Sequence, residues 1–238
     1  MIKSRKERGT IMGRKILYPY VIIEFALFFV SILANMTDIG INAEIFTLIG
    51  VGLNIPFAAL MKTRNLRNRI FAISFTIFAF LGELLYFLGQ SLIGEISFLV
   101  AFGVMFALLL MVNKENKVIQ VVFGAIALVI GIPLIFVYHL FSNVTFIPLA
   151  LETGVLLSGF ALSFYTYRTI EAKYKPNLFF VMAGLGFFIF FKLCAVANPF
   201  VDPTAQFKDL ILMCIYAFLI PSIIMSTVSF MLFEPRAS

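Results

Sequence analysis

The sequence predicts an all-α fold, a polytopic transmembrane bundle of eight helices. Of the 238 residues, 62% are hydrophobic and only 13% are charged, whereas a soluble domain carries about a quarter charged residues. Apolar runs of about 20 residues, enough to cross roughly 30 Å of hydrocarbon, occur eight times. The basic residues gather in alternate connections between these runs. We therefore expect residues 1–238 to form a single integral membrane domain, located in the cell membrane.

The first half of the chain supplies four of the eight predicted helices. They cover residues 16–35, 44–62, 70–89 and 94–112. A basic stretch over about residues 1–15 precedes the first run, and no small-residue cleavage site follows it. We therefore expect the first helix to be retained and not removed as part of a signal peptide. Pro56 falls in the middle of the second run and should kink that helix, because proline removes a backbone donor.

The second half supplies the other four helices. They cover residues 118–140, 146–166, 178–198 and 210–233. Pro133 and Pro221 fall in the middle of the first and the last of these and should kink them too. In the run 146–166, a stripe of small residues should seat a neighbouring helix. The stripe consists of Ala150, Gly154 and Ser158.

The distribution of basic residues predicts the orientation of the bundle. All of the 18 basic residues except Lys192 and Lys208 lie before the first helix, after the second, fourth or sixth, or after the eighth. By the positive-inside rule, these segments and both termini are cytoplasmic. The net charge of +6 therefore reflects membrane topology, and no nucleic-acid partner is expected. One His and two Cys cannot form a multi-histidine metal site, and no Gly-rich phosphate loop occurs, so neither a metal nor a cofactor is predicted.

Three ionisable residues, Glu83, Glu152 and Lys192, lie inside predicted spans. Each is about six residues from the outer end of its helix, or roughly 9 Å below the outer interface. A charge in hydrocarbon costs several kcal/mol, and such residues usually face the bundle interior and mark a functional site. We therefore predict a shared polar site, open to the outside, with these three as candidate catalytic residues. Depth alone leaves open whether Lys192 pairs with Glu83 or with Glu152.

Further polar residues are predicted to support this site or to join helices elsewhere. Glu24 and Asn54 are both about eleven residues from the outer ends of the first two helices and could hydrogen-bond at mid-membrane. The supporting positions share a helix face with a site residue or lie at the outer rim, and they are Tyr86, Gln90, Glu95, His139 and Ser163.

Segments 78–89 (FAFLGELLYFLG) and 98–111 (FLVAFGVMFALLLM) resemble the YhhN family of eight-helix membrane proteins, which includes lysoplasmalogenases. The third helix of the family carries a Gly-Asp pair, which Gly82-Glu83 would match with Glu in place of Asp. The seventh helix of the family carries a Gly that is followed eight residues later by Asp. This chain has Gly184 and Lys192 at the corresponding positions. The family's histidine in helix 4 would fall near Leu109. The resemblance implies hydrolysis of the vinyl ether of a lysolipid, with Glu83 as acid and Glu152 as base.

Three alternatives to a hydrolase remain open. The charges could form a buried ion pair or triad that fixes helix packing. The same cavity could serve a non-catalytic transporter or lipid-binding protein, whose ligand would be a membrane lipid or another amphiphilic small molecule. Finally, Lys192 could be the Schiff-base lysine of a retinal-type photoreceptor, against which stands the absence of Trp.

Overall fold

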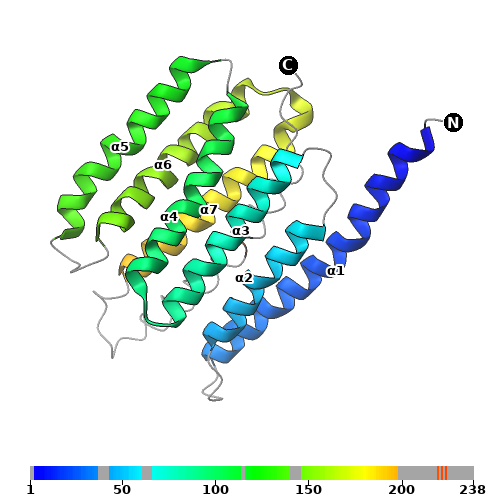
Figure 1. Cartoon of the computed structure of the whole chain (residues 1–238), viewed down its shortest axis with the longest axis horizontal. Coiled ribbons are helices and arrows are strands. Elements are labelled where there is room, and N and C mark those ends of the chain that lie inside the picture. Colours follow the sequence, from blue (N-terminus) through cyan, green and yellow to red (C-terminus); the bar gives the residue numbers. More distant parts are fainter. Residues whose placement is uncertain are drawn as a thin grey trace.

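The computed structural model describes residues 3–36, 43–60, 66–113, 116–139 and 146–197, together with Leu219, Pro221 and Ile223. These residues form an all-helical bundle without strands, which confirms the predicted fold class (Figure 1). Its helices are α1 (Lys3–Met36), α2 (Ala43–Leu60), α3 (Leu66–Phe87), α4 (Ser91–Val112), α5 (Lys117–His139), α6 (Phe146–Thr169), the 3₁₀ turn η1 (Ala172–Tyr174) and α7 (Lys175–Ala197).

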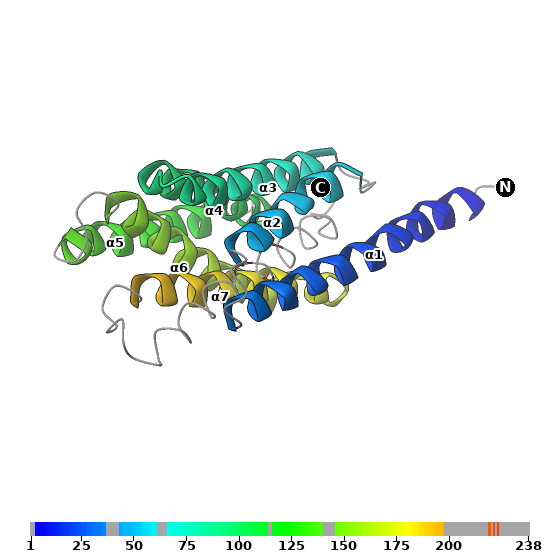
Figure 2. The ribbon, with the colours of Figure 1, turned by 90° about the horizontal axis from the view of Figure 1, so that it is seen from below.

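Seven of the predicted helices correspond to these seven α-helices, with boundaries that differ by a few residues at most ends. The largest difference is at the start of α1, which begins at Lys3 because the basic stretch continues the helix. Its 34 residues make α1 much longer than α2, with 18. Figures 1 and 2 accordingly show the N-terminal part of α1 extending past its neighbour. The predicted run 210–233 lies outside the described residues apart from the three named above, so the eight-helix count and the cytoplasmic termini stay predictions.

Five helices among the described residues are long and apolar enough to cross a membrane. They are Leu66–Phe87, Ser91–Val112, Lys117–Val137, Ile147–Thr169 and Lys175–Cys194. A helix of 20 to 23 residues spans about 30 to 35 Å at 1.5 Å per residue, which matches the hydrocarbon thickness. Two shorter apolar stretches, Tyr18–Ala34 and Glu44–Leu60, lie in α1 and α2. The chain is therefore a membrane-spanning protein.

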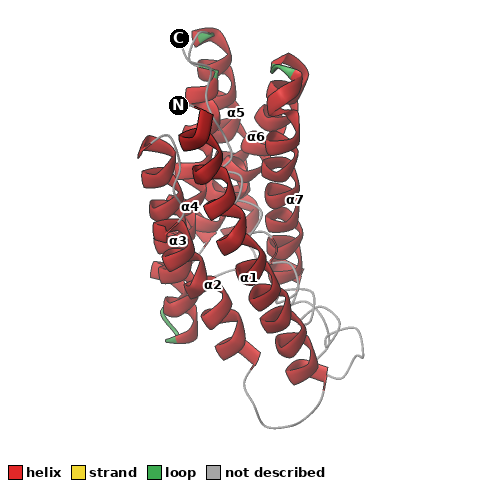
Figure 3. Ribbon diagram, turned by 90° about the vertical axis from the view of Figure 1, so that its right-hand side faces the viewer, coloured by secondary structure: helices red, strands yellow, loops and turns green. Residues whose placement is uncertain are grey.

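The helices run up and down through the bundle and pack mainly on their neighbours in sequence. In chain order, α1 packs on α2, α2 on α3 and α3 on α4, while α6 contacts α4, α5 and α7. Figure 3 shows the helices aligned along one direction, joined by short turns where the connections are described. Among the five spans, α6 is the most buried and α5 the least, because α5 lies at the edge of the bundle. Side chains on the inward faces of α4, α6 and α7 are thus the ones shielded from lipid.

Close packing between α5 and α6 confirms that the predicted small-residue stripe seats a neighbouring helix. A Cβ atom on Gly154 would come within 2.3 Å of the Ala127 carbonyl oxygen of α5. Ser158 Oγ donates a hydrogen bond of 2.6 Å to the Phe123 carbonyl on the same helix. Ala150, Gly154 and Ser158 are all buried. The stripe therefore fixes the α5–α6 pair at a short separation.

The two ends of the bundle differ in charge. The described basic side chains Arg67, Arg69, Lys117, Arg168 and Lys175 lie at the start of α3, the start of α5, the end of α6 and the start of α7. Because successive helices run in opposite directions, these positions share one end (Figure 1). We call it the basic end. The opposite end carries the α3–α4 turn and the end of α5.

Candidate functional site

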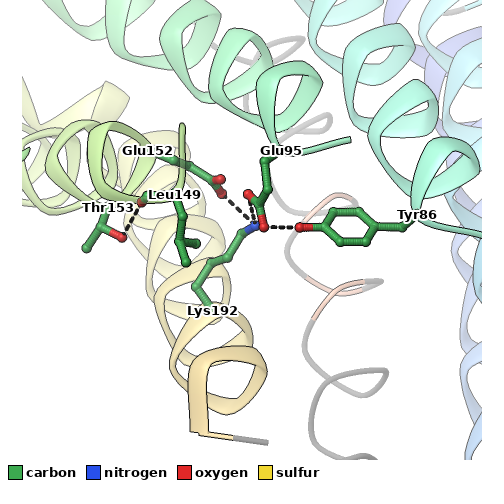
Figure 4. Close-up of polar contacts among 6 residues, drawn as sticks. All are labelled: Tyr86, Glu95, Leu149, Glu152, Thr153 and Lys192. Atoms are coloured by element: carbon green, nitrogen blue, oxygen red, sulfur yellow. Dashed lines mark hydrogen bonds and ion pairs between the residues drawn. The ribbon is translucent and has the colours of Figure 1, made fainter. Parts of the chain in front are cut away.

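Four side chains from four helices meet near the end opposite the basic end (Figure 4). They are Tyr86 of α3, Glu95 of α4, Glu152 of α6 and Lys192 of α7, and we refer to them as the Lys192 cluster. Counted along their helices from Ser91, Phe146 and Ala197, Glu95, Glu152 and Lys192 lie four, six and five residues from the nearest helix end. At 1.5 Å per residue, all three are roughly 6 to 9 Å from that end. The cluster therefore occupies one level of the bundle.

Lys192 joins the two carboxylates. Its Nζ atom donates a hydrogen bond of 2.9 Å to Glu95 Oε2 and lies 3.0 Å from Glu152 Oε1. Tyr86 donates its hydroxyl hydrogen to Glu95 Oε1. Exposure is 0% for Glu152, 5% for Glu95 and 6% for Lys192, so water cannot stabilise these charges. Each charge must be balanced by the others, because removing an ion from water costs several kcal/mol.

The two carboxylates are not equally well satisfied. Both oxygens of Glu95 accept a hydrogen bond, one from Tyr86 and one from Lys192. Glu152 is paired with Lys192 through Oε1, whereas its Oε2 atom has no hydrogen bond to a side chain or backbone group in the described part of the chain. With every group ionised, two carboxylates would share one ammonium, and the cluster would carry one net negative charge. Glu152 is the member with unused bonding capacity.

Aromatic rings surround the ammonium of Lys192 as well. The Nζ atom lies 4.8 Å from the ring centroid of Phe98, 5.4 Å from that of Phe191 and 6.0 Å from that of Tyr86. Cation–π attraction operates within about 6 Å of a ring centroid. The rings therefore stabilise a positive charge between the two carboxylates.

Glycines bring α3 and α4 close enough for Tyr86 to reach Glu95. A Cβ atom on Gly82 would come within 2.8 Å of the Phe98 ring, and one on Gly94 within 2.9 Å of the Tyr86 ring. The turn between the helices contains Gly89 with φ +75°, a left-handed conformation that side chains rarely adopt. These positions explain why a tyrosine on one helix meets a glutamate on the next.

The structure pairs Lys192 with Glu152 directly, whereas no hydrogen bond or ion pair among the described residues joins Glu83 to the cluster. Glu83 is half-buried on α3, and the hydrogen bonds and ion pairs described among the residues of the structure do not include it. It lies one turn deeper than Tyr86 and about 60° away around the helix, since three residues turn through about 300°. The membership of Glu83 in the shared site therefore stays a prediction. Depth alone left open which carboxylate pairs with Lys192. In the structure Lys192 pairs with Glu152, and Glu95 is its second partner.

The five residues predicted to support the site fall in different places. Tyr86 and Glu95 belong to the cluster itself. Gln90 is exposed in the turn before α4, where its side chain makes no capping bond, and His139 is exposed at the last residue of α5. Ser163 is buried about 16 Å further along α6 than Glu152, and its hydroxyl bonds to the Phe160 carbonyl at 2.7 Å. Ser163 is therefore too distant to act at the cluster.

The expected hydrogen bond between Glu24 and Asn54 is present and joins α1 to α2. Asn54 Nδ2 lies 3.4 Å from Glu24 Oε1 and 2.9 Å from the Gly50 carbonyl. The hydroxyl of Tyr20, a residue that we did not predict here, donates to Asn54 Oδ1. Tyr20 and Glu24 are four residues apart, so they lie on one face of the helix. This spacing is the signal in the sequence that could have indicated that Tyr20 also contacts Asn54.

Comparison of the chain with protein-family models, with curated protein sequences and with solved structures gives no match in any of the three. The class of the protein therefore follows from its fold and its site. It is a multi-pass helical membrane protein with a buried acid–base cluster near one end. Among the described residues, no group of three or more His, Cys, Asp or Glu side chains could hold a metal ion.

Proposed function

We propose that the Lys192 cluster is a cation-exchange site of a multi-pass transporter in the cell membrane, with a proton as the first cation exchanged. The observation that carries this proposal is the state of Glu152. Its carboxylate is fully buried, its Oε2 atom accepts no hydrogen bond among the described residues, and its Oε1 atom shares the ammonium of Lys192 with a second carboxylate. Ionisable residues inside membrane proteins commonly mark ion and substrate pathways.

The charge balance favours exchange over a purely structural role. One lysine and one glutamate would suffice to fix packing between two helices, and a neutral pair would be the less costly arrangement in a membrane. A buried polar group without a hydrogen bond costs about 1–3 kcal/mol, and a charged group costs more. A proton or another cation bound at Glu152 would remove this cost and the net charge together. Such a site gains stability from an occupant and can later release it.

The position of the cluster also suits exchange with one side of the membrane. The cluster is roughly 6 to 9 Å from the helix ends. The opposite end of the bundle is the basic one, which the positive-inside rule assigns to the cytoplasm. A cation would therefore reach Glu152 from the outside.

Infrared spectroscopy of the protein in proteoliposomes tests this proposal. The carbonyl stretch of protonated carboxyl groups is followed as the external pH is varied, for wild type, Glu152→Gln and Glu83→Gln. We expect wild type to show a band whose intensity changes with pH, and Glu152→Gln to lose a component of this band that Glu83→Gln, which removes a carboxylate of α3, retains. A wild-type spectrum without any pH-dependent band attributable to Glu152 would refute exchange and leave a fixed ion triad.

An ether-lipid hydrolase is the second candidate, and one specific observation favours it. The α3–α4 hairpin that resembles the YhhN family contributes two members of the cluster, Tyr86 and Glu95. Vinyl-ether hydrolysis needs a proton donor and an activated water, and Glu95 and Glu152 could take these roles. Purified protein incubated with a lysoplasmalogen should then release an aldehyde, and Glu152→Gln should not. Absence of aldehyde from the wild-type protein would dispose of this candidate.

A further inference from the structure

The connection between α6 and α7 carries cations from two helices at the basic end. Arg168 is the last residue but one of α6, Lys175 is the first residue of α7, and the short turn η1 lies between the two helices (Figure 1). Residues 168–175 include three basic residues and one acidic residue, so the connection is positively charged. Among the described residues, no ion pair joins Arg168 or Lys175 to a carboxylate. Both cations can therefore pair with an anion from outside the chain.

Aromatic rings position both of these cations. The Arg168 Cζ atom lies 4.8 Å from the ring centroid of Phe164, which is one turn earlier on α6, and Lys175 Nζ lies 5.2 Å from the ring centroid of Tyr167. Both distances are within the range of about 6 Å over which cation–π attraction operates. Because Tyr167 directly precedes Arg168, the ammonium of α7 lies beside the end of α6 that carries the guanidinium. The two charges are thus held at one place on the surface.

An exposed apolar surface continues from these cations along α6. Phe160, Phe164 and Arg168 follow one another at intervals of four residues, so they lie on one face of the helix. Phe164 and Phe160 are 46% and 37% exposed, and they lie roughly 6 and 12 Å further into the bundle than Arg168. A Cβ atom on Gly186 of α7 would lie 3.8 Å from the Phe160 ring, so this face borders α7. We call the surface formed by Phe160, Phe164, Arg168 and Lys175 the α6–α7 seam.

We propose that the α6–α7 seam binds an anionic phospholipid, whose phosphodiester contacts Arg168 and Lys175 and one of whose acyl chains lies along Phe164 and Phe160. A guanidinium presents its donors in a planar fork that matches two phosphate oxygens, and the lysine adds a second positive charge. The exposed rings lie at a depth where the ligand must be hydrocarbon. A phospholipid has a negative charge and an apolar chain at the same spacing as the cations and the rings of the seam.

The seam lies far from the Lys192 cluster, and its ligand is independent of the proposed exchange at Glu152. Lys175 and Lys192 are 17 residues apart on α7, or roughly 25 Å. Failure of one proposal therefore leaves the other unaffected.

Native mass spectrometry of the purified full chain in a neutral detergent tests the proposal with two lipids of identical acyl chains, phosphatidylglycerol and phosphatidylcholine. Wild type should bind phosphatidylglycerol more tightly. Arg168→Gln and Lys175→Gln should each weaken this binding about fivefold, the contribution of one cation at an anionic lipid surface, and leave phosphatidylcholine unaffected. The matched control is Lys117→Gln, which removes an exposed lysine of α5 at the same end and should bind like wild type.

Two further measurements test the apolar part of the seam. Phe164→Leu removes the ring beneath the guanidinium and should weaken phosphatidylglycerol binding about twofold to fivefold. Phe136→Leu, at an exposed ring of α5, should have no effect. Glycerol 3-phosphate, which has the phosphate without acyl chains, should not displace the lipid at equal concentration.

Three results would overturn the proposal. Equal affinity of wild type for the two lipids would show that charge is not recognised. A loss in Lys117→Gln as large as that in Lys175→Gln would show that the lipid responds to the charge of the whole basic end and not to the seam. Displacement by glycerol 3-phosphate at equal concentration would identify the ligand as a free phosphate ester.

Discussion

The substitution Lys192→Met leaves two buried carboxylates without the ammonium that now lies between them. Methionine preserves most of the length and volume of the side chain, so the change is chiefly one of charge. Glu152 and Glu95 are 0% and 5% exposed, and neither can turn to water without moving a helix. Breaking a buried ion pair by removing one partner costs about 3–5 kcal/mol. We expect a loss of unfolding free energy in this range, reduced to the extent that the carboxylates take up protons.

A double-mutant cycle isolates the charge effect from the change in packing. The four proteins are wild type, Lys192→Met, Glu152→Gln and the double variant, each unfolded by titration from a mild detergent into sodium dodecyl sulfate and followed by circular dichroism. Because the partners are in contact, we expect a coupling free energy of about 1–3 kcal/mol. Glu152→Gln should therefore cost less stability in the Lys192→Met background than in wild type, by the amount of the coupling.

The matched control is Glu24→Gln combined with Lys192→Met. Since the buried carboxylate of Glu24 bonds to Asn54 between α1 and α2, its effect should add to that of Lys192→Met within about 0.5 kcal/mol. Two results would refute the reasoning. One is a Lys192→Met protein within 1 kcal/mol of wild type at neutral pH. The other is a coupling of Lys192 to Glu24 as large as its coupling to Glu152.

Three further substitutions test other parts of the fold by the same unfolding titration. Tyr86→Phe removes one hydrogen bond to the buried carboxylate of Glu95 and should lower the free energy of unfolding by about 1.5–3 kcal/mol. A loss no larger than that of a Tyr→Phe substitution at an exposed position would count against this bond. Gly154→Ala should lower the free energy of unfolding by about 1–3 kcal/mol because the added Cβ atom meets the backbone of α5. The control Gly124→Ala has open space around the added Cβ atom and should be neutral or stabilising by up to about 1 kcal/mol. Equal effects of the two substitutions would contradict the close α5–α6 packing. Asn54→Leu should cost about 0.6–2 kcal/mol by removing the polar contact between α1 and α2, and an unchanged midpoint would show that this contact contributes nothing.

Much of the fold was predictable because membrane spans obey a single strong constraint. A run of about 20 apolar residues must be a helix, since no other single segment satisfies its own backbone in hydrocarbon. This is why seven runs correspond to seven helices. The start of α1 was missed because polarity indicates where a span leaves the membrane and not where the helix begins. The orientation and the eighth helix rest on the sequence alone.

The candidate site was only partly predictable, because residue counting gives depth along a helix but not direction around it. Depth brought Glu152 and Lys192 together correctly, and it added Glu83, for which no hydrogen bond or ion pair is found among the described residues. Glu95 was placed at the rim because the run of apolar residues begins close to it. In the structure α4 starts at Ser91, so Glu95 lies a full turn inside the helix and is buried. The partner of a buried charge depends on which helices are neighbours, and that information comes from packing.

The Lys192 cluster joins parts of the bundle that are otherwise held together in different ways. The pairs α3–α4 and α5–α6 are packed at glycines so closely that a single methyl group would clash. Helix α7 packs on α6, but it reaches α3 and α4 through long side chains, as in the contacts of Phe188 with Phe75 and Phe102 and of Lys192 with Glu95. The closely packed pairs thus hold Tyr86, Glu95 and Glu152 in place, and Lys192 brings the ammonium of α7 to them. Its two ion pairs therefore join α7 to α4 and to α6 through one buried charge, so removal of that charge weakens both connections at once.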